Sequence, residues 1–119
     1  MAKKILIVED DAILRKILAL GLTTAGYETL TAANGEEAIP LVQQEKPDII
    51  MADLHMPVMD GLRFLRWLRG EAAITTPVVV FTGSVQADIL REAKEAGATI
   101  ILRKPVKTAK LLETLVTLG

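Results

Sequence analysis

The chain has 119 residues, a formal net charge of −1 and no cysteine, and half of its residues are hydrophobic. This length fits one domain with one core, so we expect residues 1–119 to form a single domain. The missing cysteines exclude disulfides and thiolate metal sites. Balanced charge argues against direct binding of nucleic acid. No apolar stretch reaches the about 18 residues of a membrane helix, and Met1-Ala2-Lys3-Lys4 lacks signal-peptide features. We therefore expect a cytoplasmic protein with no membrane partner.

Short apolar runs alternate with longer segments of helical periodicity along the whole chain. Strands are predicted at residues 4–8, 28–32, 49–53, 78–82 and 99–102. Helices are predicted at residues 11–25, 35–45, 61–70, 86–96 and 108–118. Five βα units this short predict an α/β fold, a doubly wound parallel sheet with helices on both faces.

The strand patterns also predict positions in the sheet. Residues 28–32 alternate between apolar and polar and fit an edge, whereas the other four runs are nearly continuously apolar and fit central positions. Pro40 predicts a kink or a late start of the second helix. Ser84 is a candidate N-cap for a helix that begins near Val85.

Two helices carry patterns that predict which side chains are buried. In the first helix, apolar residues recur at three- and four-residue steps, which predicts one buried face; they are Ile13, Leu14, Ile17, Leu18 and Leu20. In the third helix, Arg63, Arg66 and Arg69 recur near Trp67. A solvated helix face is the favoured interpretation, and a small basic patch for a protein partner is the alternative.

Polar side chains stand at the ends of four predicted strands. Glu9 and Asp10 follow the first, Asp53 ends the third, Thr82 ends the fourth, and Lys104 follows the fifth. In open α/β sheets, ligands bind beyond the carboxyl ends of the strands. We therefore expect these groups to meet at one edge, as a site for a divalent cation and a phosphoryl group.

The residue types in this cluster suit phosphoryl transfer. Crowded carboxylates repel one another, and Mg²⁺ relieves this with one or two carboxylates, waters and phosphate oxygens as ligands. Asp10 and Asp53 would supply the carboxylates, and Glu9 would hold a metal-bound water. Asp53, kept ionised, would attack a phosphoryl group to give an aspartyl phosphate. Lys104 would offset the charge on the phosphoryl oxygens, and Thr82 would donate a hydrogen bond to one of them.

The chain resembles the receiver domains of two-component response regulators, such as the bacterial chemotaxis response regulator, over essentially its whole length. The resemblance implies a flavodoxin-like fold with strand order 2-1-3-4-5. It rests on four motifs in family order and spacing: Ile-Leu-Ile-Val-Glu9-Asp10-Asp11, Asp53-Leu-His-Met-Pro-Val-Met-Asp60-Gly61, Val-Val-Val-Phe-Thr82-Gly-Ser and Lys104-Pro105.

By this resemblance Asp53 is the phosphoacceptor, and Glu9 and Asp10 are the acidic pair that binds Mg²⁺. The backbone carbonyl of His55 would be a third protein ligand of the metal. Asp11 and Asp60 are expected to cap helices instead. The phosphoryl donor would be a sensor histidine kinase or a histidine phosphotransfer protein.

The resemblance further implies that Thr82 is the switch hydroxyl, that Lys104 is the lysine of the site, and that the Lys104–Pro105 peptide is cis. One position departs from the family pattern. Receivers commonly place an aromatic residue three positions before that lysine, and this chain has Ile101.

The resemblance implies a signalling switch that phosphorylates and dephosphorylates itself rather than a metabolic enzyme. A downstream effector or a fused output domain would receive the signal, and the chain itself ends after the fifth predicted helix. Two rivals stay open: a pseudo-receiver scaffold, and a phosphatase or phosphotransferase with an aspartate nucleophile. Haloacid-dehalogenase-like enzymes usually carry a second aspartate where this chain has His55. Flavin binding is not favoured, because the sequence has no phosphate-binding loop and too few aromatic residues to form the walls of a flavin site.

Overall fold

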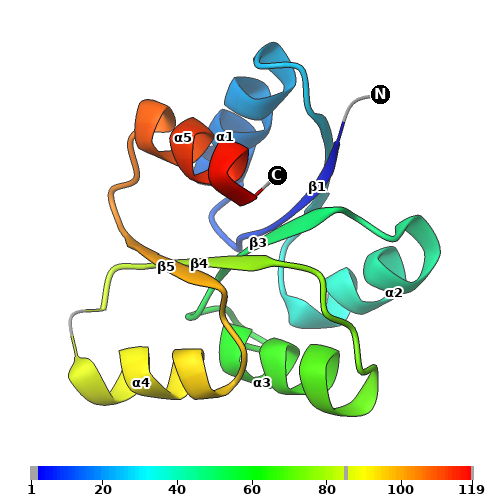
Figure 1. Ribbon diagram of the computed structural model, residues 1–119, viewed down its shortest axis with the longest axis vertical. Coiled ribbons are helices and arrows are strands. Elements are labelled where there is room, and N and C mark those ends of the chain that lie inside the picture. The colour runs from blue at the N-terminus through cyan, green and yellow to red at the C-terminus, as the bar shows by residue number, and fades with distance from the viewer. Residues whose placement is uncertain (1–2, 85, 119) are drawn as a thin grey trace.

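The computed structural model describes residues 3–84 and 86–118, in which strands and helices alternate (Figure 1). Their order is β1 (Lys4–Val8), α1 (Ala12–Thr24), β2 (Glu28–Ala32), α2 (Gly35–Glu45), β3 (Ile49–Asp53), α3 (Gly61–Arg66), the π-helical segment η1 (Trp67–Glu71), β4 (Val78–Thr82), α4 (Ala87–Glu95), β5 (Ile100–Arg103) and α5 (Thr108–Leu118). This order confirms the predicted α/β architecture. None of the helices in these ranges is long and apolar enough to cross a membrane.

All strands are parallel, in the order β2-β1-β3-β4-β5 that the family resemblance implies. β2 lies at one edge, as its alternating pattern predicted. β5 lies at the other edge, so the central position predicted from its apolar run was wrong. The β5 side chains from Ile100 to Leu102 are only partly buried, because this strand has one neighbour and covers the end of the sheet.

The helices cover the two faces of the sheet, with α1 and α5 on one face and α2, α3 and α4 on the other (Figure 1). Alternate strand residues feed two separate cores, since successive side chains of a strand point to opposite faces. Ile5 and Ile7 pack with α1 and α5, whereas Leu6 and Val8 pack with the other three helices. β1, β3 and β4 are buried on both faces, which explains their continuous apolar sequences.

α1 is apolar on two faces, and only one of them is buried. Leu18 and Leu22 pack into the core, while Ile13, Ile17 and Leu20 are 73%, 57% and 69% exposed. The sequence prediction that all five apolar residues share one buried face was therefore wrong. Ile13, Ile17 and Leu20 form a stripe of their own, at steps of four and three residues along the outer side of the helix.

α2 and α5 have the predicted bounds, α1 and α4 are one residue shorter at each end, and the third predicted helix changes type after Arg66. α2 begins at Gly35 and runs through Pro40, so it does not start late. Beyond Arg66 the chain forms π-type hydrogen bonds, of which Ala72 N–H to the Trp67 carbonyl is one. Ser84 accepts a hydrogen bond from Gln86 N–H, but the N-cap residue of α4 is Gln86 itself. Val85, the predicted start of that helix, lies outside the described residues.

Arg69 ties three backbone segments together, so its predicted solvated position was wrong. Its guanidinium donates hydrogen bonds to the carbonyl oxygens of Ile74 (2.8 Å), Thr76 (2.7 Å) and Gly97 (2.9 and 3.2 Å). Burial lowers the pKa of Arg69. The left-handed turn at Gly97 (φ +113°) lies so close to the arginine that a Cβ there would collide with it.

We expect Arg69→Met to lower the free energy of unfolding by about 2 kcal/mol, because three carbonyl oxygens lose their partner at a half-buried position. Urea denaturation measures the loss. Arg63→Met is the matched control on the same helical segment, and its exposed side chain should change stability by less than about 0.5 kcal/mol. Equal losses in the two variants would contradict the role assigned to Arg69.

Candidate functional site at the carboxyl edge of the sheet

The predicted acidic residues meet beyond the carboxyl ends of β1 and β3, which are neighbours in the sheet. Val8 pairs with Ala52, so the next residues, Glu9 and Asp53, leave adjacent strands at the same height. Carboxylate oxygens of Glu9, Asp10 and Asp53 lie within 4.8 Å of one another. Glu9 and Asp53 are buried, whereas Asp10 is exposed.

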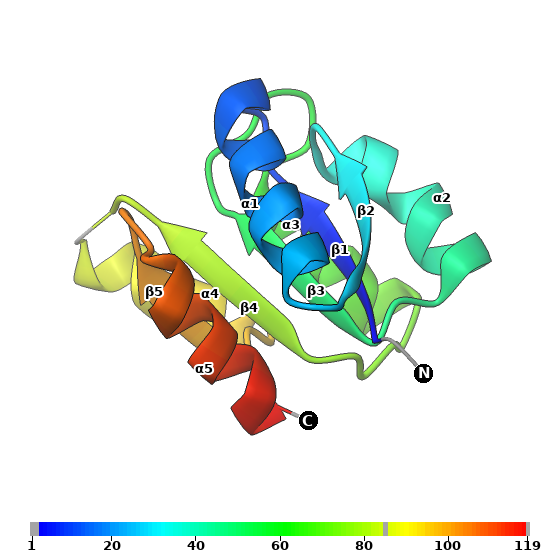
Figure 2. The same ribbon diagram turned by 90° about the horizontal axis from the view of Figure 1, so that it is seen from above.

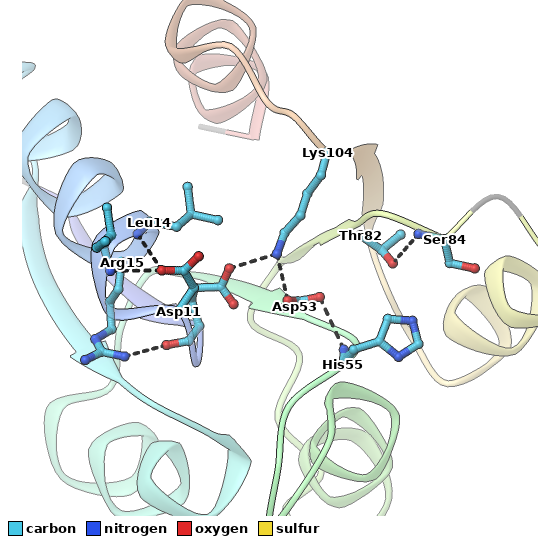
Figure 3. A network of polar contacts seen from close by, with 10 residues as sticks. Asp11, Leu14, Arg15, Asp53, His55, Thr82, Ser84 and Lys104 are labelled. Atoms are coloured by element: carbon cyan, nitrogen blue, oxygen red, sulfur yellow. Dashed lines mark hydrogen bonds and ion pairs between the residues drawn. The ribbon is translucent and has the colours of Figure 1, made fainter.

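Lys104 joins two of these carboxylates (Figure 3). Its Nζ lies 2.8 Å from Glu9 Oε1 and 2.8 Å from Asp53 Oδ2, and 5.3 Å from the centre of the Phe81 ring. Burial alone would lower the pKa of Lys104, but hydrogen bonds and attraction from Asp53 and Glu9 outweigh it and raise that pKa above its ordinary value. The lysine is therefore a fixed positive charge at the centre of the site.

Glu9 is the carboxyl group of the cluster whose charged form is disfavoured by burial. Its side chain is fully buried, and its Oε2 has no hydrogen-bond partner in the described part of the chain. Burial raises the pKa of Glu9 to about 7, although the hydrogen bond from Lys104 opposes the shift, and neighbouring Asp53 adds to it. A buried carboxylate oxygen without a partner is costly. This oxygen is therefore a candidate position for a proton or a cation.

The remaining predicted residues surround Asp53. The second oxygen of Asp53, Oδ1, accepts a hydrogen bond from the His55 backbone N–H (3.2 Å), and the imidazole is exposed beside it (Figure 3). Thr82 is fully buried on β4, one residue beyond Phe81, which pairs with Asp53. Its hydroxyl oxygen accepts a hydrogen bond from Ser84 N–H (3.1 Å). The fold thus brings together every residue that the sequence placed in the site.

Two residues fix the backbone around the acidic pair. Asp11 caps α1, as predicted, and accepts hydrogen bonds from Ile13 N–H (3.0 Å) and Leu14 N–H (3.2 Å). Arg15, which the sequence analysis missed, donates a hydrogen bond to the Glu9 carbonyl oxygen (2.7 Å). Its signal was a basic side chain one turn after the cap residue, on a helix that follows directly from the site.

The turn after β3 depends on Gly61. Asp60 caps α3 through Arg63 N–H (2.9 Å), as predicted, and Gly61 N–H donates to the Leu54 carbonyl oxygen (3.0 Å). A Cβ at Gly61 would collide with the Asp53 carbonyl oxygen. Glycine therefore allows the start of α3 to pack against the residue that carries the site.

The segment after β5 places the lysine. The Lys104 backbone N–H donates to the Thr82 carbonyl oxygen (2.8 Å), and the Lys104–Pro105 peptide is cis, as the family resemblance implies. Ile101 packs against the core under α2, α3 and α4, where the family commonly has an aromatic residue. This side chain has no polar group to exchange between core and solvent.

A five-stranded parallel sheet in the order 2-1-3-4-5 defines the flavodoxin-like class of α/β domains, and this chain carries an acidic cluster and a lysine at the carboxyl edge of that sheet. Within this class the family is clear from the sequence. The family model of the response regulator receiver domain matches residues 5–116, and the chain belongs to this family.

Known relatives differ widely in length. The sensory/regulatory protein RpfC of Xanthomonas campestris pv. campestris is 37% identical over 119 residues, which cover 98% of this chain but 16% of RpfC. The polar-differentiation response regulator DivK of Brucella anthropi is 28% identical, with 97% and 94% of the two chains covered. The chain thus spans about a sixth of the first relative and nearly all of the second.

The fold comparison agrees with the sequence comparison. The solved structure of the chemotaxis protein CheY4 of Vibrio cholerae is 35% identical and superposes with a TM-score of 0.93 over 100% of both chains. The chain is therefore similar to receiver domains in its whole extent, including the edge where the acidic cluster lies.

Proposed function

We propose that residues 1–119 act as a phosphoacceptor switch, with Asp53 as the residue that takes up the phosphoryl group. The observation that carries this proposal is the placement of Asp53 at the sheet edge, 2.8 Å from Lys104 Nζ and close to the carboxylates of Glu9 and Asp10. A carboxylate that only capped a turn would need neither the paired lysine nor the two acidic neighbours. The family membership supports the same role.

The residues of the site fit a hard divalent cation. Three carboxylates face one lysine, and the buried Oε2 of Glu9 has no partner among the described residues. Oxygen ligands and spare negative charge are the donor set that Mg²⁺ prefers. Glu9, Asp10, Asp53 and the His55 carbonyl are the candidate ligands. When bound, the cation would offset the charge of the phosphoryl oxygens and favour the ionised form of Asp53.

The transfer itself uses groups of this chain. A carboxylate oxygen of Asp53 attacks the phosphorus of a phosphohistidine, and the bond from phosphorus to the imidazole nitrogen breaks. The leaving imidazole keeps the electron pair and takes a proton from solvent. Lys104 pairs with a phosphoryl oxygen, and the Thr82 hydroxyl, one strand away, turns from Ser84 N–H to donate to another.

The partners follow from this chemistry. The donor is a sensor histidine kinase or a histidine phosphotransfer protein, and the added charge favours one of two arrangements of the Thr82–Ser84 segment. The protein is then a signalling switch rather than a metabolic enzyme. A downstream effector or a fused output domain would read the switched surface, and RpfC-like relatives illustrate a receiver within a much longer chain.

Incubation with Mg²⁺ and acetyl phosphate, followed by intact mass spectrometry, tests the proposal. We expect one phosphoryl group on the wild-type chain, none on Asp53→Asn, and none when EDTA removes the metal. Asparagine keeps the size of the side chain, so loss of the adduct reports on the missing nucleophile. Asp88→Asn, an exposed aspartate that pairs with Arg91 on α4, is the matched control and should be phosphorylated like the wild type.

Two results would contradict the proposal. An adduct that survives in Asp53→Asn would place the phosphoryl group elsewhere. A wild-type chain that binds Mg²⁺ but takes no phosphoryl group from acetyl phosphate or from a phosphorylated histidine protein would favour the pseudo-receiver scaffold.

A further inference from the structure

A cavity of about 330 Å³ lies on the face of the sheet that α1 and α5 cover. Figure 2 shows these two helices in front of the sheet, seen from that side. Leu14 and Leu18 of α1, Phe81 of β4 and Leu111 of α5 are among its walls. Lys104 also reaches the cavity, and its position above the Phe81 ring places the phosphoacceptor site next to it.

The volume of the cavity matches that of small-molecule sites, and its predominantly apolar lining sets it apart from other hollows of similar volume on the described part of the chain. Protein interiors are close-packed, with few voids larger than a water molecule. An engineered apolar cavity of about 150 Å³ stays dry and binds benzene, and small-molecule sites begin at about 300 Å³. Leu18, Phe81 and Leu111 are 8% exposed or less and form the buried part of the wall, whereas Pro105 is exposed, so the cavity opens to solvent there. A cavity of this size is too small for a protein helix and suits a molecule of about two fused rings.

The chemistry of the walls selects a neutral ligand. Within the described residues, the lining side chains are apolar apart from Lys104. The Lys104 ammonium is already held by Glu9 and Asp53, at 2.8 Å each, so it has little to offer a ligand anion. A charged ligand would lose its hydration and gain no ion pair. An uncharged aromatic or alicyclic molecule would bury its surface at no such cost.

We propose that this cavity is a binding site for small neutral hydrophobic molecules of about the size of indole. A ligand in it packs against Phe81 and the aliphatic stem of Lys104. The occupied cavity therefore restricts the lysine that pairs with Asp53, and it alters the lifetime of the phosphorylated form. This last consequence rests on the proposed phosphoacceptor function, whereas binding itself does not.

Titration of the ¹⁵N-labelled full chain with indole tests the site. We expect saturable shifts of the Leu18, Phe81 and Leu111 amides and NOE contacts from indole to the Leu18 and Leu111 methyl groups. Leu14→Phe places a ring in the cavity and should weaken indole binding about tenfold or more, a loss of about 1.4 kcal/mol. Leu41→Phe, at a partly buried leucine of α2 on the other face of the sheet, is the matched control and should bind like the wild type.

Val106→Phe fills the cavity from the segment before α5 and replaces Leu14→Phe if that variant does not fold. Wild-type shifts that do not saturate up to the solubility limit of indole, or binding that survives in a folded cavity-filling variant, would overturn the proposal. The half-life of the aspartyl phosphate with and without indole is the second readout. Unchanged half-lives would overturn the coupling and leave the binding site standing. If Asp53 takes no phosphoryl group, the amide titration still decides whether the site exists.

Discussion

Replacing Lys104 with methionine is expected to lower the free energy of unfolding by about 3 kcal/mol at pH 8 without metal, the low end for breaking a buried ion pair, because Lys104 is partly exposed while both of its carboxylate partners are buried. Methionine retains most of the length and the apolar stem of the lysine but has no charge. The buried carboxylates of Glu9 and Asp53 would then face each other without the ammonium that lies 2.8 Å from each. Urea denaturation in EDTA measures the loss, which should shrink at lower pH as Glu9 takes up a proton.

Lys4→Met is the control for this substitution. Lys4 is about as exposed as Lys104 (25% against 27%), but its partner Glu45, 3.2 Å away, is 41% exposed, whereas Glu9 and Asp53 are 0% and 6% exposed. Solvent screens such a pair, so its loss should cost less than about 1 kcal/mol. If the two variants lose the same stability, Lys104 is an ordinary surface lysine, and the argument for a central charge in the site fails.

The position of the site was predictable because the fold places the carboxyl ends of all the strands at one edge of the sheet. Each of the polar residues Glu9, Asp53, Thr82 and Lys104 interrupts or follows an apolar run. In a parallel sheet these ends lie at one edge, so residues that follow different strands in the sequence come close together in the fold. Family order of the motifs then supplied the strand order, which the apolar patterns alone had placed wrongly for β5.

The roles of neighbouring side chains within the site were less predictable. Glu9 and Asp10 are adjacent in sequence, yet Glu9 is buried against Lys104, and Asp10 is exposed. The sequence analysis predicted that Glu9 would hold a metal-bound water, and it did not predict the direct ion pair between Glu9 and Lys104. The difference arises because successive side chains at a strand end point in opposite directions, and tertiary neighbours decide which direction is buried.

Side chains whose partners are distant in the sequence were also not predicted, because tertiary neighbours decide their environment. Arg69 looks like Arg63 and Arg66 in the sequence, but its acceptor at Gly97 lies 28 positions away. The apolar residues of α1 satisfy a helical period on two faces, and only the position of the sheet decides that Leu18 is buried and Ile17 is not. Periodicity shows that a face is apolar, not that something covers it.

The metal-free protein is expected to lose stability as the pH rises from 5 to 8. Glu9 has an ordinary pKa of 4.5 in the unfolded chain and a pKa of about 7 in the folded protein, because burial penalises its charged form. The folded state therefore holds more protons between these values, and its stability falls as the pH passes through them. The contribution is fully present below pH 4.5 and is gone above about pH 7.

The expected loss is roughly 2–3 kcal/mol, since one pKa unit corresponds to about 1.4 kcal/mol. Urea denaturation at several pH values in EDTA measures it, and Glu9→Gln is the control. Glutamine has nearly the same shape and no charge, so the variant should show a flatter profile over the same range. Identical slopes in the two proteins would mean that Glu9 is not the group responsible.

Mg²⁺ should oppose this loss of stability at high pH if Glu9 belongs to its site. A cation that binds the folded state stabilises it by mass action, and it competes with the proton for the Glu9 carboxylate. The stabilisation on adding Mg²⁺ should therefore be larger at pH 8 than at pH 6 in the wild type, and this pH difference should be smaller in Glu9→Gln. If Mg²⁺ stabilises the wild type equally at both pH values, Glu9 is not a ligand of the cation and serves only as a structural partner of Lys104.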